Sequence, residues 1–210
     1  MRRGAIVLGV VAVMAGWSLA VAGLGFTGHM IAHMTVVSIA APLIAFGMAG
    51  TSYDPASRWP LLFSPLPMSM VEMLIVWGWH LPAARAFASS TATGLLLEQC
   101  MFLGGGLLLW CSCLGTLDSA STPRRAAGVI ALLLTTMHMT LLGVLIALAP
   151  RSLFGRTGFD WLGIVVAPLA DQHLGGVMML LIGAGSYLLG GLVLMSRLLW
   201  RGDRAEAWRT

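Results

Sequence analysis

Six apolar segments occupy most of this chain of 210 residues and limit what it can fold into. Each is close to the roughly 20 residues that an α-helix needs to cross about 30 Å of hydrocarbon. Hydrophobic residues make up 58% of the sequence and charged residues only 10%, which excludes an ordinary soluble globular protein. We therefore expect an all-α, polytopic transmembrane helical bundle with about six spans. The expected spans are 5–23, 29–49, 67–82, 93–115, 127–149 and 172–198.

No internal repeat, low-complexity tract or long linker divides the chain, so residues 1–210 are expected to form a single integral membrane domain. The first apolar segment follows Met1-Arg2-Arg3 and resembles a signal peptide, with Ala20-Val21-Ala22 placed like a cleavage site. Its apolar run is longer than the roughly 7–15 residues of a signal-peptide core, however. This length favours an uncleaved membrane anchor.

The arginines predict the orientation, because positively charged residues accumulate on the cytoplasmic side of a membrane. All twelve basic residues are arginines. With a cytoplasmic N-terminus, nine of them lie inside and three, Arg85, Arg151 and Arg156, lie outside. We therefore expect both termini in the cytoplasm. The arginines form no basic run with interleaved aromatic residues, so membrane lipid is an expected partner and nucleic acid is not.

Residues 28–42, GHMIAHMTVVSIAAP, contain two histidines in an otherwise apolar run. His29 and His33 are four residues apart, so on a helix they lie about 40° apart on one face, one turn above the other. Met30 and Met34 repeat this spacing on the adjoining face. Imidazole nitrogen beside soft thioether sulfur suits copper, above all Cu(I), better than magnesium or calcium. Packing is the alternative role, since methionine fills helix interfaces and a membrane histidine often only hydrogen-bonds a neighbouring helix.

The predicted orientation gathers the histidines and two acidic residues in the outer half of the bundle. They begin or end the second, third, fourth and sixth predicted spans, and His138 lies deeper in the fifth. Ionisable groups in membrane segments are costly and mark functional sites. The candidate metal-site residues are His29, His33, His80, His138, His173, Met30, Met34, Met137, Met139, Glu98 and Asp171.

Two to four of these donors suffice for one copper ion, and the two carboxylates would orient imidazoles, relay protons or accept Cu(II). Two other interpretations stay open. A bis-histidine haem, held by His33 with His138 or by His29 with His173, would make the chain a membrane electron carrier. A non-catalytic accessory subunit of a respiratory complex would use the same groups as hydrogen bonds between helices. A GxSxG motif would indicate a hydrolase, but the sequence contains none. We therefore expect no enzyme activity.

Five short motifs occur in an order that resembles the polytopic CtaG-type cytochrome c oxidase assembly factors. They are GHMIAHM, WGWHLP, LLEQCMFLGGGLLLW, MHMTLLGVLIALAP and PLADQHLGG, and the resemblance covers about residues 25–195. It implies a multi-pass protein of the bacterial cytoplasmic (inner) membrane that is needed to make active haem–copper oxidase, by helping copper reach its binuclear centre. The family positions fall on His29, His33, His80, Glu98, His138 and Asp171.

The resemblance also implies partners, namely the catalytic subunit of a haem–copper oxidase and other oxidase assembly factors. Copper would be held transiently at an outer-facing His/Met site, and transfer favours few, exchangeable ligands over a closed four-ligand cage. Two features depart from the family. Relatives often carry another spanning segment, and Gln99 stands in LLEQC where many relatives are expected to have His. Since Gln is a poor copper ligand, position 99 is not among the candidates.

Overall fold

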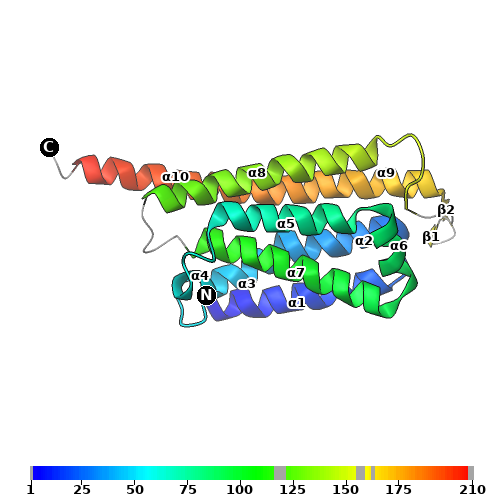
Figure 1. Ribbon diagram of the computed structural model, residues 1–210, viewed down its shortest axis with the longest axis horizontal. Helices are drawn as coiled ribbons and strands as arrows, with labels where there is room; N and C mark the ends of the chain where they lie inside the picture. Colours follow the sequence, from blue (N-terminus) through cyan, green and yellow to red (C-terminus); the bar gives the residue numbers. More distant parts are fainter. Residues whose placement is uncertain (1, 116–121, 155–158, 162–163, 208–210) are drawn as a thin grey trace.

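The computed structural model describes residues 2–115, 122–154, 159–161 and 164–207, which form a bundle of long, nearly parallel helical rods (Figure 1). Two of the rods are continuous through a π-helical turn, η1 in one and η2 in the other. In chain order the helical elements are α1 (Arg2–Val21), α2 (Gly25–Met34), η1 (Thr35–Ala40), α3 (Ala41–Met48), α4 (Pro55–Arg58), α5 (Pro65–Trp79), α6 (Pro82–Ser90), α7 (Ala92–Leu114), α8 (Thr122–Ala147), α9 (Pro168–Met178), η2 (Met179–Ala184) and α10 (Gly185–Ala207).

The two ends of the bundle differ. Both chain termini lie at one end, which we call the terminal end (Figure 1). The opposite end, which we call the α6 end, holds α6, the α1–α2 turn and a short hairpin. This hairpin pairs β1 (Phe159–Trp161) with β2 (Ile164–Val166) in antiparallel register. The shared end agrees with termini on one side of a membrane, while the cytoplasmic assignment stays a prediction, and Arg156 lies outside the described residues.

Five segments of the described chain are long and apolar enough to cross a membrane: α1, Gly25–Met48, α7, α8 and Pro168–Trp200. They confirm an all-α, multi-pass architecture. The expected third span corresponds to α5, which has 15 residues. At 1.5 Å per residue α5 is about 22 Å long, less than the roughly 30 Å of a hydrocarbon layer. A sixth span therefore stays a prediction, although α5 packs inside the same bundle (Figure 1).

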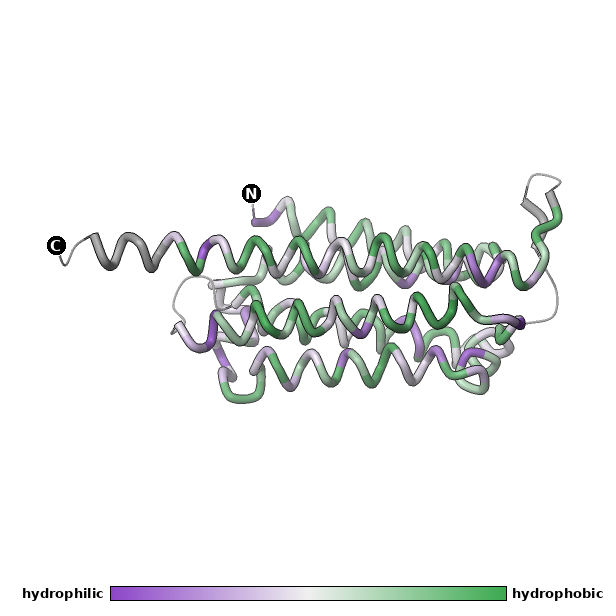
Figure 2. Tube along the Cα trace, turned by 90° about the horizontal axis from the view of Figure 1, so that it is seen from above, coloured by the Kyte–Doolittle hydropathy of each residue, from purple (hydrophilic) through white to green (hydrophobic). Residues whose placement is uncertain are grey.

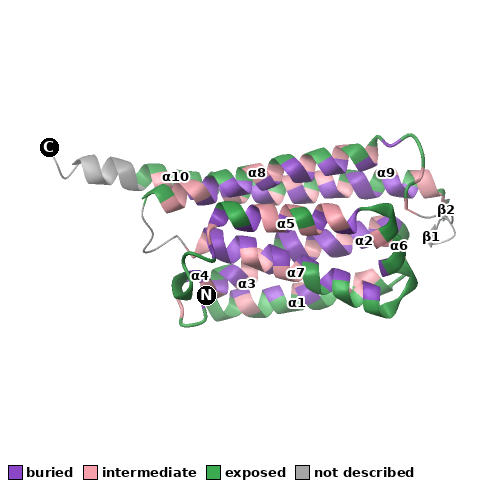
Figure 3. Ribbon diagram, in the orientation of Figure 1, coloured by how far each residue is buried: buried purple, intermediate pink, exposed green. Residues whose placement is uncertain are grey.

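Apolar residues cover the outside of the bundle as well as its interior. Figure 2 shows hydrophobic stretches along whole rods, with hydrophilic residues gathered near their ends. Figure 3 shows that exposed residues follow the outer sides of α1 and α10. The exposed apolar residues of α1 are Val7, Leu8, Val10, Val11 and Met14. An apolar surface this continuous is unfavourable in water, and it fits contact with lipid chains.

Small residues let α1 lie close to the rod α2–η1–α3. The buried residues of α1 are Ala5, Gly9, Val13 and Gly16. A Cβ atom added at Gly9 would lie 2.6 Å from Ile44 Cγ1 and 3.1 Å from the Ala40 carbonyl oxygen. Glycine is therefore needed at this position for the two backbones to approach, as in other membrane helix pairs.

Pro42 accounts for part of the π-helical turn η1. Proline has no N–H, and its ring clashes with the carbonyl four residues earlier, which is that of Ser38. The Ser38 carbonyl instead accepts a hydrogen bond from Ser186 Oγ at 2.7 Å. The carbonyl that Pro42 leaves without a partner in its own helix thus forms a hydrogen bond with α10.

The same turn frees a second carbonyl. The Ala41 N–H donates to Val36 O, five residues back, rather than to Val37 O. Trp110 Nε1 of α7 donates to Val37 O at 3.0 Å. A π-helical turn often marks a functional region, and here it attaches the middle of the rod to a neighbouring helix.

Asp171, near the start of α9, caps the N-terminus of α2. Its carboxylate accepts hydrogen bonds from the backbone N–H groups of Phe26 at 2.7 Å and Thr27 at 2.8 Å. The residue that precedes α2, Leu24, supplies no side-chain cap. The first N–H groups of a helix have no partner within it and favour negative charge. A carboxylate from a distant part of the chain therefore completes α2.

Gln172 and His173 attach α9 to the end of α8 and to the loop that follows. Gln172 Nε2 donates to the Ile146 carbonyl at 3.3 Å, and its Oε1 accepts from the Leu153 N–H at 2.6 Å. His173 Nε2 lies 3.0 Å from the Ala149 carbonyl, to which it donates because a carbonyl can only accept. Together with Asp171, these residues hold the α6 end in one arrangement.

The first prediction concerns the approach of α1. Gly9→Leu should lower the free energy of unfolding by about 1–3 kcal/mol, because the larger side chain must displace Ile44 and the α3 backbone. Gly4→Leu is the matched control, since nothing lies within 4 Å of a Cβ at Gly4. Thermal unfolding in detergent measures both. Equal stability of the two variants would contradict the packing described here.

The second prediction concerns the cap of α2. Asp171→Ala should destabilise the protein by about 1–3 kcal/mol, because two N–H groups lose their acceptor. Asp171→Asn should be intermediate, since it keeps one acceptor oxygen and loses the charge. Denaturant unfolding measures the series. A metal-ligand role for Asp171 predicts the opposite pattern, with unchanged unfolding and loss of bound copper.

Candidate functional site

Three histidines from two helices meet near the α6 end. His29 and His33 lie on α2, and His80 directly follows α5, where the helix ends. The ring centroids are 6.4 Å apart for His29 and His33, 6.1 Å for His29 and His80, and 5.4 Å for His33 and His80. Their exposed fractions are only 4%, 0% and 5%. We call these three residues the histidine cluster.

Phe102 of α7 lies against the histidine cluster. Its ring centroid is 3.9 Å from that of His33, with the rings nearly perpendicular. It is 6.1 Å from the ring centroids of both His29 and His80. Phe102 is itself buried, so it closes the cluster on the α7 side and keeps water away from it.

The ring nitrogens of the cluster are almost all without partners. Both nitrogens of His29, both of His33 and Nε2 of His80 are buried and make no hydrogen bond. A buried polar group in this state costs about 1–3 kcal/mol. Such groups in a native structure call for an explanation, for example a bound ion or water. The cluster therefore has the donors of a site that receives a ligand.

His80 has a defined tautomer. Its Nδ1 lies 2.6 Å from the Val76 carbonyl oxygen, which can only accept a hydrogen bond. Nδ1 therefore carries the hydrogen, and the buried Nε2 presents a lone pair. A backbone bond of this kind fixes the ring and the tautomer of a metal-binding histidine.

A buried ion pair lies beside the histidine cluster. Arg85 Nη1 of α6 donates to both carboxylate oxygens of Glu98, at 3.1 and 2.9 Å. Glu98 Oε2 also lies 3.7 Å from His29 Nδ1, too far for a hydrogen bond but close enough for electrostatic attraction to a protonated Nδ1. Glu98 is completely buried, whereas the Arg85 side chain is 15% exposed. The carboxylate is thus positioned to orient His29.

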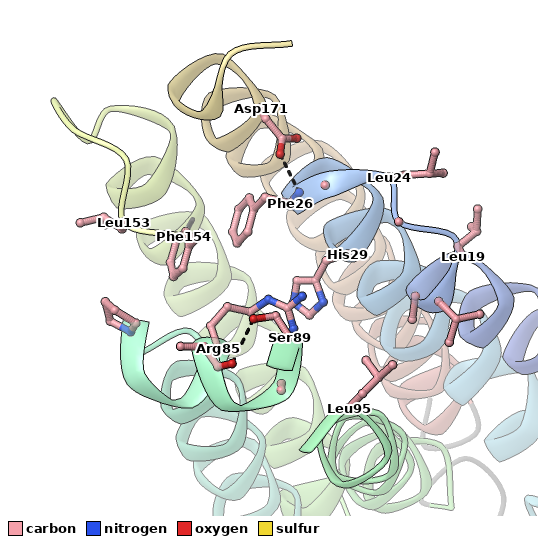
Figure 4. Close-up of a pocket in the computed structure, with 17 residues that line it drawn as sticks. Leu19, Leu24, Phe26, His29, Arg85, Ser89, Leu95, Leu153, Phe154 and Asp171 are labelled. Atoms are coloured by element: carbon pink, nitrogen blue, oxygen red, sulfur yellow. Dashed lines mark hydrogen bonds between the residues drawn. The ribbon is translucent and has the colours of Figure 1, made fainter. Parts of the chain in front are cut away.

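A cavity of about 600 Å³ leads to this pair from the α6 end. Arg85 extends from α6 toward His29, and Phe26 and Phe154 stand on the opposite wall (Figure 4). The rings of Phe26 and Phe154 are stacked at a centroid distance of 4.4 Å. Asp171 also lines the cavity, where it makes its bond to Phe26 (Figure 4). The cavity reaches His29 of the histidine cluster, while His33 and His80 do not line it.

The candidate methionines point away from the histidine cluster. Met30 and Met34 lie against α9 and η2, because Cβ atoms added at Gly175 and Gly183 would meet their side chains at 3.1 Å. Met139 borders Gly183 as well. Met137 is 69% exposed and faces outward from α8. The adjoining face of α2 therefore packs against other helices, while the histidine face meets α5 and α7.

Three further candidates, His138, His173 and Asp171, also lie outside the histidine cluster. His138 is buried in α8, and neither it nor His173 makes a ring contact with the cluster in the described part of the chain. His173 bonds the Ala149 carbonyl, and Asp171 caps α2. The structure thus brings together His29, His33, His80 and Glu98 from the predicted set.

Arg85 and Phe102 belong to the site although the sequence did not single them out as site residues. From the sequence, Arg85 served only to predict the membrane orientation. It is nevertheless a charged residue in a mostly apolar region, 13 positions before Glu98. Phe102 follows Glu98 by four residues, so both lie on one face of α7. Helical spacing from Glu98 is the signal that identifies Phe102.

The side chains as they stand do not yet surround a metal position. Within the described residues, no group of three His, Cys, Asp or Glu side chains has the geometry to hold an ion. The chemistry of the donors nevertheless fits a transition metal, since neutral imidazole is a good ligand for copper, zinc and iron.

Comparison with known proteins assigns the chain to a family. No curated protein and no solved structure matches the chain. The family model described as cytochrome c oxidase caa3 assembly factor (Caa3_CtaG) matches residues 1–201, a range that includes the histidine cluster, Arg85 and Glu98. The chain therefore belongs to the cytochrome c oxidase caa3 assembly factor family.

Proposed function

We propose that this protein holds Cu(I) transiently at the histidine cluster and supplies it to a haem–copper oxidase during assembly. Membership of an oxidase assembly factor family supports the general role. The observation that carries the copper proposal is the set of five buried imidazole nitrogens without hydrogen-bond partners, all in one place. Neutral imidazole nitrogens bind copper well, and a role in oxidase assembly favours copper among the metals that imidazole suits.

The spacing of the rings supports one shared ion. Metal–imidazole bonds are about 2.0–2.1 Å long, so three imidazoles on one ion have ring centres roughly 5–6 Å apart. The observed ring centroids are 5.4, 6.1 and 6.4 Å apart. A rotation of the His29 ring, which has the two longer distances, would complete the arrangement.

The surroundings support release as well as binding. Three protein ligands leave the ion a free position, as in metal sites that exchange a ligand rather than in closed structural sites. The cavity beside His29 gives a recipient access from the α6 end. With the arginine bias of the sequence, this end faces the outer side of the inner membrane. The recipient in this proposal is the catalytic subunit of the oxidase.

The third prediction tests the ligand set. His29→Gln, His33→Gln and His80→Gln should each weaken Cu(I) retention by at least about tenfold, because each removes an imidazole from the site. His138→Gln and His173→Gln are matched controls and should retain copper, since both lie away from the cluster. The measurement is copper content of detergent-purified protein, loaded anaerobically against a competing chelator.

The same preparation discriminates the other functions. Equal loss in the control variants would show that the histidine cluster is not the copper site. A Soret band with no retained copper would indicate a haem-binding electron carrier. Neither copper nor haem, with lasting association to the mature oxidase, would indicate an accessory subunit. In cells, the cluster variants should lower oxidase copper content while their expression stays normal.

The fourth prediction concerns the methionines. The double change Met30→Leu and Met34→Leu should leave the Cu(I) affinity unchanged, because both side chains pack against α9 and η2 rather than toward the histidine cluster. Stability should change by less than about 1.5 kcal/mol, since Leu replaces Met with similar volume. A competition titration measures the affinity. Loss of copper in this variant would support a mixed His/Met site instead.

A further inference from the structure

We propose that Arg85 is a displaceable counter-ion, which neutralises Glu98 in the metal-free protein and moves into the cavity when a soft monovalent cation binds the histidine cluster. The proposal rests on copper binding at this cluster, which is the proposed function above. It goes further by assigning a role to Arg85 and by specifying the charge of the cargo.

The position of Glu98 motivates the proposal. Its carboxylate faces two groups, the Arg85 guanidinium and the Nδ1 edge of the neutral His29 ring, whose Nε2 remains free for a metal. Arg85 reaches it through Nη1 alone, at 2.9 Å from Oε2, while His29 Nδ1 is 3.7 Å from the same oxygen. A small shift of Glu98 toward His29 would convert that approach into a hydrogen bond and weaken its contact with Arg85.

Charge balance supplies the driving force. In the metal-free protein, Glu98 and Arg85 form a neutral pair beside neutral imidazoles. A monovalent cation at the histidine cluster adds one positive charge to a region that excludes water. An unpaired charge in such a region is strongly unfavourable. Neutrality returns only if one cation leaves, and Arg85 is the cation that can move.

The structure provides a place for the displaced side chain. Arg85 lines the cavity of about 600 Å³, so its guanidinium can rotate away from Glu98 without entering packed core. Asp171 lines the same cavity and offers a second carboxylate. The arginine side chain is long and flexible, and it is already partly exposed while Glu98 is not. Displacement therefore moves Arg85 toward water and leaves Glu98 to the metal site.

A single carboxylate also selects the charge of the cargo. After Arg85 leaves, Glu98 balances one positive charge, so a monovalent ion gives a neutral site. A divalent ion would leave one positive charge uncompensated in the bundle. The site should therefore prefer Cu(I), and the redox-stable probe Ag(I), over Zn²⁺, although imidazole alone binds zinc well.

The fifth prediction follows from this competition. Arg85→Gln should bind Cu(I) about tenfold or more tightly, because the competing cation is gone and Glu98 is free to compensate the metal. Glu98→Gln should bind more weakly, because Arg85 then repels the ion. Arg151→Gln is the matched control, since it removes an exposed arginine from the same end of the bundle and should not change the affinity.

Stability gives an independent measure. Without metal, the Arg85→Gln variant should be less stable than the unaltered protein, because Glu98 loses its partner. Cu(I) should raise the unfolding temperature of this variant more than it raises that of the unaltered protein. The double variant Arg85→Gln, Glu98→Gln keeps the pair uncharged and should recover metal-free stability. If Arg85 instead supports the site, Arg85→Gln will bind Cu(I) equally or more weakly, and the counter-ion proposal is overturned.

Displacement is tested directly by chemical modification of arginine. A dicarbonyl reagent and peptide mass spectrometry should show faster modification of Arg85 when Ag(I) is bound, and no change with Zn²⁺ at the same concentration. Arg151 should react at the same rate in all conditions. Unchanged or slower reaction of Arg85 in Ag(I)-loaded protein would overturn the proposal.

The two proposals fail in different ways. If the unaltered protein retains no Cu(I), both the copper function and the counter-ion are overturned. If it retains Cu(I) through the histidine cluster but Arg85→Gln binds no more tightly, only the counter-ion is overturned.

Discussion

The exclusion of water from the bundle is the constraint on which the rest of this structure depends. A polar group inside such a bundle must find its partner within the protein. Several do so across helices, as Tyr187 does by donating to Glu72, and as Ser69 and Thr135 do at 2.9 Å. In the part of the chain that the structure describes, twelve buried side-chain nitrogen and oxygen atoms lack a partner, and five belong to the histidine cluster. The cluster is the largest group among them, and the others belong to His138, Gln99, Trp17, Trp77 and Glu72.

The same constraint explains why the rod α2–η1–α3 is held both at its start and in its middle. Asp171 satisfies the N–H groups at its start, and Trp110 and Ser186 satisfy the carbonyls that η1 and Pro42 leave free. Each of these bonds comes from a different neighbouring helix. The depth and rotation of α2 are thereby fixed relative to α5 and α7. A rigid α2 is what places its two histidines beside His80, and preorganised donors are a requirement of a metal site.

The sequence predicts the long helices well, because apolar run length has a direct physical meaning in a membrane. The third expected span, 67–82, corresponds to α5, which ends at Trp79; Pro82 begins the separate helix α6, since proline favours the first helical turn. Within the site, i and i+4 spacing correctly places His29 and His33 on one face. This spacing does not show which helices flank α2. It therefore cannot predict that the face with the two histidines forms the site and the face with Met30 packs against other helices. That choice depends on tertiary packing.

Arg85 connects the orientation signal of the sequence with the chemistry of the site. Arginines on the outer side run against the positive-inside bias, so each needs a local reason to be there. For Arg85 the reason is a carboxylate, because Glu98 is fully buried and would be unstable without a positive partner. An arginine that the predicted orientation places on the outer side is therefore explained by the buried carboxylate it neutralises.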